Sequence, residues 1–442
     1  MKPFISSVGS RYSLPKRQFY SPFLLPGAAA LVVSLFVGLG ISTTVQAAEP
    51  LSLAQALSLA EARSRALTAQ DSAVLAAKEM AGASGQLPDP TLKLGINNLP
   101  INGEDQFSLT RDFMTMRSVG VMQEFTREDK RRARASRFER EAEAAMASRA
   151  MALANLQRDT AQAWLNRYYQ ERLRALLVSQ RDEARLQIEA ADTAYHTGRG
   201  SQADVFAARI AVAQIEDRMV QYDRQIATAN TRLARWVGPG VDATSDVLPN
   251  MDAVPLNGGE LPALLAHRPE LALMEKQEQM AAAEADIAKA NKKPDWTAEL
   301  MFAQRGPAYS NMVSINFSVP IQWDQSKRQD RELAAKLATV EQLRAQREEA
   351  TRGHLAETQA MLQEWQSNRA RMTRFDSTQI PLAKERTQAA LVAYRGGGGT
   401  LTAVLEARRM ELDTRTERIR LEMETALLWA QLNYLAPANT LH

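Results

Sequence analysis

The chain has 442 residues, 45% of them hydrophobic but only 6% aromatic, and Ala, Arg, Glu, Gln and Leu dominate, as is typical of long helices and coiled coils. Its net charge of +3 is close to balance, and bases alternate with acids, so nothing favours a nucleic-acid-binding protein. The absence of Cys excludes disulfides and lipid attachment to an N-terminal Cys.

The N-terminus has the features of an export signal. Several Lys and Arg residues precede an apolar run at 23–41, and small residues follow at a cleavage point near Ala47. A retained membrane anchor is the alternative, but Pro and Gly within the run weaken a spanning helix. We therefore predict a signal peptide over 1–47 and an exported protein. No later stretch is apolar enough for a membrane helix, so any membrane must be crossed by strands.

The mature chain begins with a predicted helix over 53–85. Two segments of alternating apolar and polar residues follow, at 91–98 and 118–125. Residues 129–195 contain neither Gly nor Pro and predict one helix of about 65 residues, roughly 100 Å long. A helix of this length needs coiled-coil packing against neighbours.

A tight turn and a returning helix complete this first half. Gly198 and Gly200 predict the reversal, and Ser201 is placed to cap a helix that runs to about Trp236. The stretch 238–260 is rich in Pro, Gly, Asp and Asn, and we predict that it is a linker.

The second half has the same order of elements. Residues 296–303 and 313–323 alternate again, and a long helix is predicted over 325–394, with a kink or break at Pro381. Four Gly residues at 396–399 predict a second turn, and Thr400 is placed to cap a helix that runs to about Leu435.

The alternating segments have the length and pattern of membrane-crossing strands, although one face of a soluble antiparallel sheet remains an alternative. Charges that face lipid are costly, so the polar residues of these strands are predicted to line a pore. These residues are Lys93, Asn97, Glu124, Glu299 and Asn316.

The chain contains an internal duplication. Seven of the sixteen positions at 194–209 are identical to those at 393–408. A repeat of about 200 residues is too long for a solenoid and indicates two copies of one large unit. We predict a first repeat at 48–237, the linker at 238–260 and a second repeat at 261–442.

Four strands per chain cannot close a barrel, and an open sheet edge in lipid leaves backbone groups without partners. Strands must therefore be pooled between subunits. Two chains would give eight strands and a plugged barrel, whereas three would give twelve and room for a lumen, so three is favoured.

Over residues 48–442 the chain resembles the TolC family of outer-membrane efflux channels. The strand pairs, the paired long helices, the tip motif (Tyr195, Gly198 and Val205 recurring as Tyr394, Gly397 and Val404) and the stretch from His267 to Leu271 carry the resemblance. It implies a fold that is mainly α with a small β part: an outer-membrane β-barrel of 12 strands in a homotrimer, continued by a periplasmic α-helical coiled coil. It also implies docking to a periplasmic adaptor protein and an inner-membrane efflux pump of the RND type.

The resemblance implies a periplasmic gate at the two Gly turns. The family's gate tyrosine matches Tyr394 and its gate acid matches Asp204. The family's gate arginine falls at Gly399 here, and Arg395 or Arg199 could take its role. The family also has a ring of acidic residues inside the mouth, at two positions that fall at Ala403 and Glu406 here. Only Glu406 is acidic. The predicted gate residues are Tyr195, Gly198, Gly200, Asp204, Tyr394, Arg395, Gly397, Gly399 and Glu406. Core packing for the tyrosines and a favourable helix-dipole position for the acid remain alternatives.

No catalytic constellation is recognisable, since the four His residues are far apart and lack metal-ligand spacing. We therefore predict no enzyme activity, no cofactor and no metal site. Methionines gather near the strands, where thioethers either favour soft ions such as Cu(I) or serve as hydrophobic filler. They are Met114, Met116, Met122, Met301 and Met312.

Segments 97–100 and 110–117 look like the heavy-metal branch of the family. The sequence is thus interpreted as a passive outer-membrane exit duct, with metal cations as the favoured substrate. A duct for drugs or secreted polypeptides, and a soluble periplasmic coiled-coil adaptor, are the alternatives.

Overall fold

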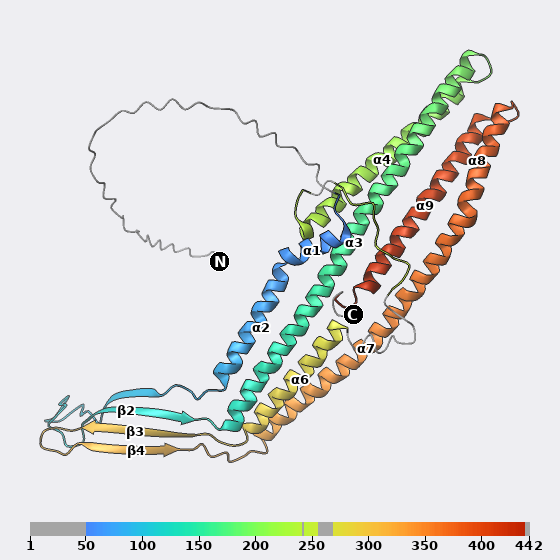
Figure 1. Ribbon diagram of the computed structural model, residues 1–442. Coiled ribbons are helices and arrows are strands. Elements are labelled where there is room, and N and C mark those ends of the chain that lie inside the picture. The colour runs from blue at the N-terminus through green and yellow to red at the C-terminus, as the bar shows by residue number, and fades with distance from the viewer. Residues whose placement is uncertain (1–49, 241–242, 255–267, 438–442) are drawn as a thin grey trace, which may run out of the picture. The chain divides into compact units, whose positions relative to one another are not determined.

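The computed structural model describes residues 50–240, 243–254 and 268–437 (Figure 1). The predicted signal peptide at 1–47 lies outside the described residues, as do His267 and part of the predicted linker. Among the described helices, none combines the length and the apolar character that a membrane span requires.

In the first half, residues 50–240 form four helices and two strands. They are α1 (Leu53–Arg63), α2 (Arg65–Ser84), β1 (Thr91–Asn97), β2 (Met116–Phe125), α3 (Glu128–His196) and α4 (Gln202–Val237). The single helix expected over 53–85 is wrong, because Ser64 is extended (φ −70°, ψ 106°) and separates α1 from α2. Its hydroxyl accepts a hydrogen bond from the Leu67 amide, so Ser64 ends one helix and caps the next.

The second half repeats this order. It contains α6 (Pro269–Ala290), β3 (Trp296–Gln304), β4 (Met312–Ser318), α7 (Gln329–Arg374), the π-helical turn η1 (Phe375–Gln379), α8 (Ile380–Arg395) and α9 (Leu401–Asn433). The kink or break expected at Pro381 takes the form of a π turn: η1 interrupts the α-helical ladder directly before this residue, and α8 begins at Ile380 and continues through Pro381. A π turn accommodates a proline, which has no amide proton for the helical ladder.

Strand β4 ends at Ser318 and is therefore shorter than the predicted strand at 313–323. Ser318 pairs with Thr297, next to the first residue of β3, so the ladder has no partner beyond that point. Pro320 also lacks an amide donor. Val319, Ile321 and Trp323 therefore lie outside the sheet, and the Trp323 side chain is 89% exposed.

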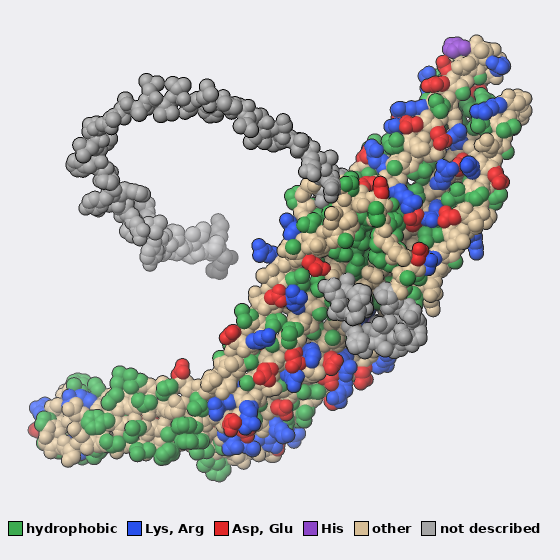
Figure 2. Space-filling view, in the orientation of Figure 1, with side chains coloured by type: hydrophobic (Ala, Val, Ile, Leu, Met, Phe, Trp, Pro, Cys, Tyr) green, Lys and Arg blue, Asp and Glu red, His purple; other side chains and the backbone are tan. Residues whose placement is uncertain are grey.

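The four strands form one antiparallel sheet in the order β1-β2-β3-β4. Leu94 pairs with Val119, Val121 with Leu300, and Ile315 also with Leu300, so apolar residues share one face. β1 and β4 are the edge strands, with no strand beyond them among the described residues. Hydrophobic side chains cover much of the strands in Figure 2, whereas charged side chains spread over the helices.

The largest core lies where α1, α3, α4, α7 and α9 meet. Trp164, Leu165 and Tyr169 of α3 are fully buried there against Leu233 of α4 and Ala430 of α9. This core joins the two halves of the chain, because α3 and α4 come from the first and α7 and α9 from the second.

Candidate functional site

One face of the sheet is apolar and exposed. Leu94, Ile315 and Phe317 are 74%, 64% and 70% exposed, although each has apolar neighbours on adjacent strands. The exposed apolar side chains on this face are Leu92, Leu94, Ile96, Val119, Val121, Trp296, Leu300, Phe302, Val313, Ile315 and Phe317. An apolar surface of this extent needs a partner or a lipid phase to cover it.

The opposite face is polar and holds all five predicted pore-lining residues. Lys93 lies opposite Gly120, Glu124 opposite Thr297, and Glu299 opposite Asn316. Asn97, at the end of β1, donates a hydrogen bond from Nδ2 to Ser118 Oγ at 3.0 Å. The strands therefore place these residues on one surface, as the alternation predicted, while their role as pore lining remains a prediction.

An ion pair crosses β2 on this polar face. Lys93 Nζ of β1 lies 3.0 Å from Glu299 Oε2 of β3, so the ammonium reaches over Gly120. A Cβ at Gly120 would lie 2.9 Å from the Leu300 carbonyl oxygen and 3.2 Å from Met301 Cα. The glycine therefore permits the close approach of β3 and leaves the path above β2 open for the Lys93 side chain.

The two helix tips have the same turn geometry. Gly198 and Gly397 both have positive φ (72° and 79°), which a side chain would strain. The amide of each donates to the carbonyl of the preceding tyrosine, Tyr195 or Tyr394. The duplicated sequence thus produces a duplicated turn, and the predicted gate glycines are explained by the local backbone.

The tyrosines at the two tips lie in different surroundings. Tyr195 is 43% exposed, and its ring is tilted against the ring of His196, with the two ring centroids 5.6 Å apart. Tyr394 is half-buried and packs on a cluster formed by Ala191, Val205 and further residues of α3, α4 and α9. The sequence left core packing and gating open as roles for this tyrosine. In the single chain the Tyr394 ring is packed against this cluster.

Asp204 caps its own helix. Its carboxylate accepts hydrogen bonds from the Ser201 hydroxyl at 2.7 Å and the Ser201 amide at 3.0 Å, while Ser201 Oγ accepts from the Asp204 amide. This capping box holds the pKa of Asp204 below its usual range, chiefly through the Ser201 hydroxyl and then the Ser201 amide. The sequence predicted the serine cap but not the reciprocal role of the acid.

Acid is expected to loosen the first tip. A carboxyl whose pKa is lower in the folded tip than in the open one stabilises the tip fully above about pH 4, and this stabilisation is lost as the pH falls through the folded value. A spin label at Arg199→Cys should therefore gain mobility below about pH 4.

A label at Gly398→Cys is the matched control, because Ala403 replaces the acid in the second tip. Equal acid responses at both labels would contradict a role for Asp204 in holding the first turn.

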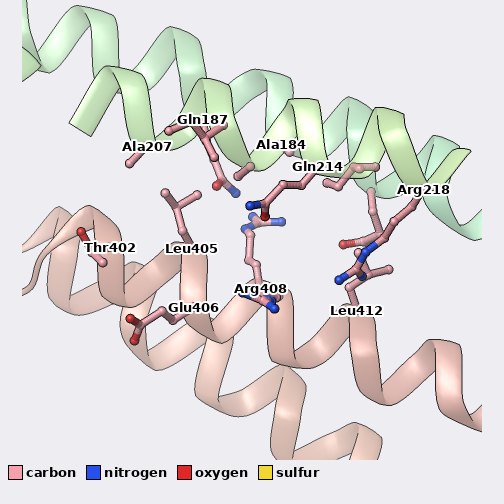
Figure 3. A pocket seen from close by; sticks show the side chains of 15 residues that line it. Ala184, Gln187, Ala207, Gln214, Arg218, Thr402, Leu405, Glu406, Arg408 and Leu412 are labelled. Atoms are coloured by element: carbon pink, nitrogen blue, oxygen red, sulfur yellow. The ribbon is translucent and has the colours of Figure 1, made fainter. Parts of the chain in front are cut away.

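The other predicted gate residues lie at the second tip and along α9. Arg395 is exposed, and a Cβ at Gly399 would lie 3.0 Å from the Tyr394 amide nitrogen, so an arginine there would disturb the turn. Glu406 is exposed and lines a cavity of about 190 Å³ between α3, α4 and α9. Gln187 of α3 and Arg408 of α9 extend into this cavity from opposite sides (Figure 3).

An ion pair that was not predicted from the sequence joins the sheet to the helices. Lys130 Nζ, with a side chain 7% exposed, lies 2.8 Å from Asp295 Oδ2, and Asp295 Oδ1 accepts the Arg127 amide at 3.0 Å. Asp295 thereby fixes the start of α3 against the start of β3. The recurrence of Pro88-Asp89 as Pro294-Asp295 was the available signal.

Among the residues that the structure describes, no three His, Asp or Glu side chains gather closely enough to hold a metal ion. The sheet and the tips are separated by α3, whose 69 residues span roughly 100 Å. The candidate functional surfaces are therefore two: the two-faced sheet and the paired tips.

Of the comparisons with protein families, curated proteins and solved structures, the comparison with solved structures gives matches. No protein-family profile and no curated protein sequence matches the chain. The outer-membrane channel OprN is similar at 17% identity and a TM-score of 0.72, covering 87% of this chain and 89% of its own. The outer membrane protein VceC of Vibrio cholerae has 19% identity, a TM-score of 0.70 and coverages of 87% and 95%.

CusC, described for its folding and transmembrane channel formation, has 18% identity, a TM-score of 0.70 and coverages of 88% and 91%. At these identities the likeness establishes the fold. The chain has the fold of outer-membrane channel proteins, so the predicted fold class, mainly α with a small β part and two internal repeats, is confirmed.

Proposed function

We propose that this chain is one subunit of a homotrimeric outer-membrane exit channel in a tripartite efflux system. The observation that carries the proposal is the sheet, which exposes a wide apolar face and presents charged and amide side chains on the other face. Each of its two edge strands is paired on one side and has no partner on the other among the described residues. A sheet of this kind is stable in lipid when its edges pair with those of other subunits.

Three copies would supply twelve strands and a water-filled lumen lined by Lys93, Asn97, Glu124, Glu299 and Asn316. The helices would continue this duct into the periplasm. The division into repeats at 48–237 and 261–442, cleavage of the signal peptide and an outer-membrane location belong to the same proposal. The channel conducts passively, so a periplasmic adaptor and an inner-membrane pump of the RND type provide the drive.

Heavy-metal cations are the proposed substrate, because the segments 97–100 and 110–117 resemble those of the family's heavy-metal branch. A duct for drugs or secreted polypeptides is the second candidate, since the same fold would serve it. A soluble adaptor is disfavoured, because its sheet would not leave eleven large apolar side chains exposed on one face.

Growth of a deletion strain distinguishes the substrates. Hypersensitivity to Cu, Ag, Co, Zn, Cd or Ni salts, with normal tolerance of dyes and detergents, is the expected result. Sensitivity to dyes and detergents with normal metal tolerance would contradict metal efflux and favour a drug duct.

Removing the Tyr394 ring is expected to open the periplasmic mouth. The ring packs between α3, α4 and α9, so Tyr394→Ala should loosen the contact between the two tips and raise single-channel conductance in planar bilayers. Tyr394→Phe keeps the ring and should conduct like the natural protein. Unchanged conductance in the alanine variant, with an intact trimer, would remove Tyr394 from the gate.

A further inference from the structure

The four strands carry four methionines, and all of them lie on the polar face. Met116 pairs with Asn97, Met122 with Glu299, and Met301 with Gly120, while Met312 pairs with Ala303. Each of these partners is on the surface that holds Lys93 and Asn316, because facing residues in adjacent strands point to the same side of a sheet.

The methionines also divide evenly along the strands. Residues on one face of a strand recur every second position, about 6.6 Å apart, and form successive rows across the sheet. Each of four successive rows contains one methionine. The rows are Thr91, Met122, Glu299 and Asn316; Lys93, Gly120, Met301 and Ser314; Gly95, Ser118, Ala303 and Met312; and Asn97 with Met116.

Hydrophobic packing predicts the opposite distribution. The apolar face of the same strands is built from Leu, Ile, Val, Phe and Trp with a few other residues, and it contains no methionine. Methionine used as filler would occur on the face that lipid or a partner covers. Its restriction to the face with the charged and amide side chains indicates a function for the thioether.

The row with Met122 offers the most complete site. Glu299 faces Met122 directly, and Met301 is the diagonal neighbour, within reach of a long flexible side chain. Glu299 Oε1 is buried and has no hydrogen-bond partner among the described residues, since Lys93 contacts the other oxygen, Oε2. Two thioethers and one unpartnered carboxylate oxygen therefore lie close together.

We infer that these methionines bind soft monovalent cations, Cu(I) or Ag(I), with the strongest site at Met122, Met301 and Glu299 and weaker sites in the rows beyond. Thioether sulfur selects soft ions over hard ones such as Na⁺ or Mg²⁺. Lys93 offsets the charge of Glu299, so the cation is held weakly, as passage from row to row requires. The inference rests on the proposed channel and assigns its substrate class.

The test uses the full trimer in detergent, labelled with ¹³C at the methionine methyl groups and titrated with AgNO₃ in chloride-free buffer. We expect the Met122 and Met301 methyl signals to shift first, with no response to NaNO₃. Met122→Leu/Met301→Leu keeps side-chain volume and should weaken Ag⁺ binding by about tenfold or more. Met146→Leu/Met410→Leu, at exposed helical positions 45% and 48% accessible, should bind Ag⁺ as the natural protein does.

Shifts at Met146 and Met410 that match those of the strand methionines, or unchanged Ag⁺ affinity in Met122→Leu/Met301→Leu, would overturn the inference. Conductance of the same preparations in KNO₃ separates the two hypotheses. Normal conductance without a selective Ag⁺ response rejects the methionine sites and leaves the channel, whereas absence of conductance rejects the channel itself.

Discussion

Ile315→Arg is expected to prevent most of the protein from assembling in the outer membrane. Ile315 is 64% exposed near the middle of β4, opposite Leu300 on the apolar face. An arginine facing lipid near the midplane costs about 2–4 kcal/mol, and a symmetric trimer would incur this cost three times. The measurement is the yield of trimer in the outer-membrane fraction, quantified on native gels.

Asn316→Arg is the matched control, because it places the same charge one residue further along, on the polar face. This variant should assemble at close to the natural yield. If both variants assembled equally well, the assignment of the two faces would be wrong.

Trp164→Ala is expected to destabilise the junction of the two halves by about 3–5 kcal/mol, the usual cost of truncating a buried aromatic residue. The Trp164 side chain is fully buried, stacks on Tyr168 with centroids 5.6 Å apart, and donates from Nε1 to the Leu51 carbonyl at 2.8 Å. Its loss removes packing between five helices and releases the start of α1. Unfolding in urea, followed by the helical circular-dichroism signal, measures the change.

Trp323→Ala supplies the control within the same chain, because this tryptophan is 89% exposed and lies outside the sheet. Its helical signal should melt with the natural midpoint. A midpoint for Trp164→Ala equal to that of Trp323→Ala would contradict the placement of the core around α3.

Much of the fold follows from periodicity. Period-two alternation located the four strands and assigned Lys93 and Glu299 to one face, since a strand can place its side chains on two sides alone. The recurring tip motif predicted a reversal at each tip, and the two turns have the same geometry. The absence of Gly and Pro predicted α3 almost to its ends, because nothing in that stretch interrupts a helix.

The exceptions are places where a local alternative competes. Ser64 divides the first helix because its hydroxyl supplies an N-cap, which periodicity does not report. The end of β4 depends on where β3 begins, and this is a property of pairing between distant segments. An interruption was expected at Pro381, but its form, a π turn over Phe375–Gln379, was not.

The candidate sites were less accessible to sequence reasoning. Tyr195 and Tyr394 occupy the same motif position but differ in burial, because burial depends on which helices pack against each tip. The rows of methionines required the register between strands, since alternation gives the face of a residue but not its neighbours across the sheet.

Planar-bilayer recording of the protein purified from outer membranes tests the central proposal most directly. A channel of pooled strands predicts discrete, reproducible conductance steps from a trimeric preparation. Recovery of the chain as a monomer in the soluble periplasmic fraction, with no conductance steps when it is added to a bilayer, would contradict the account.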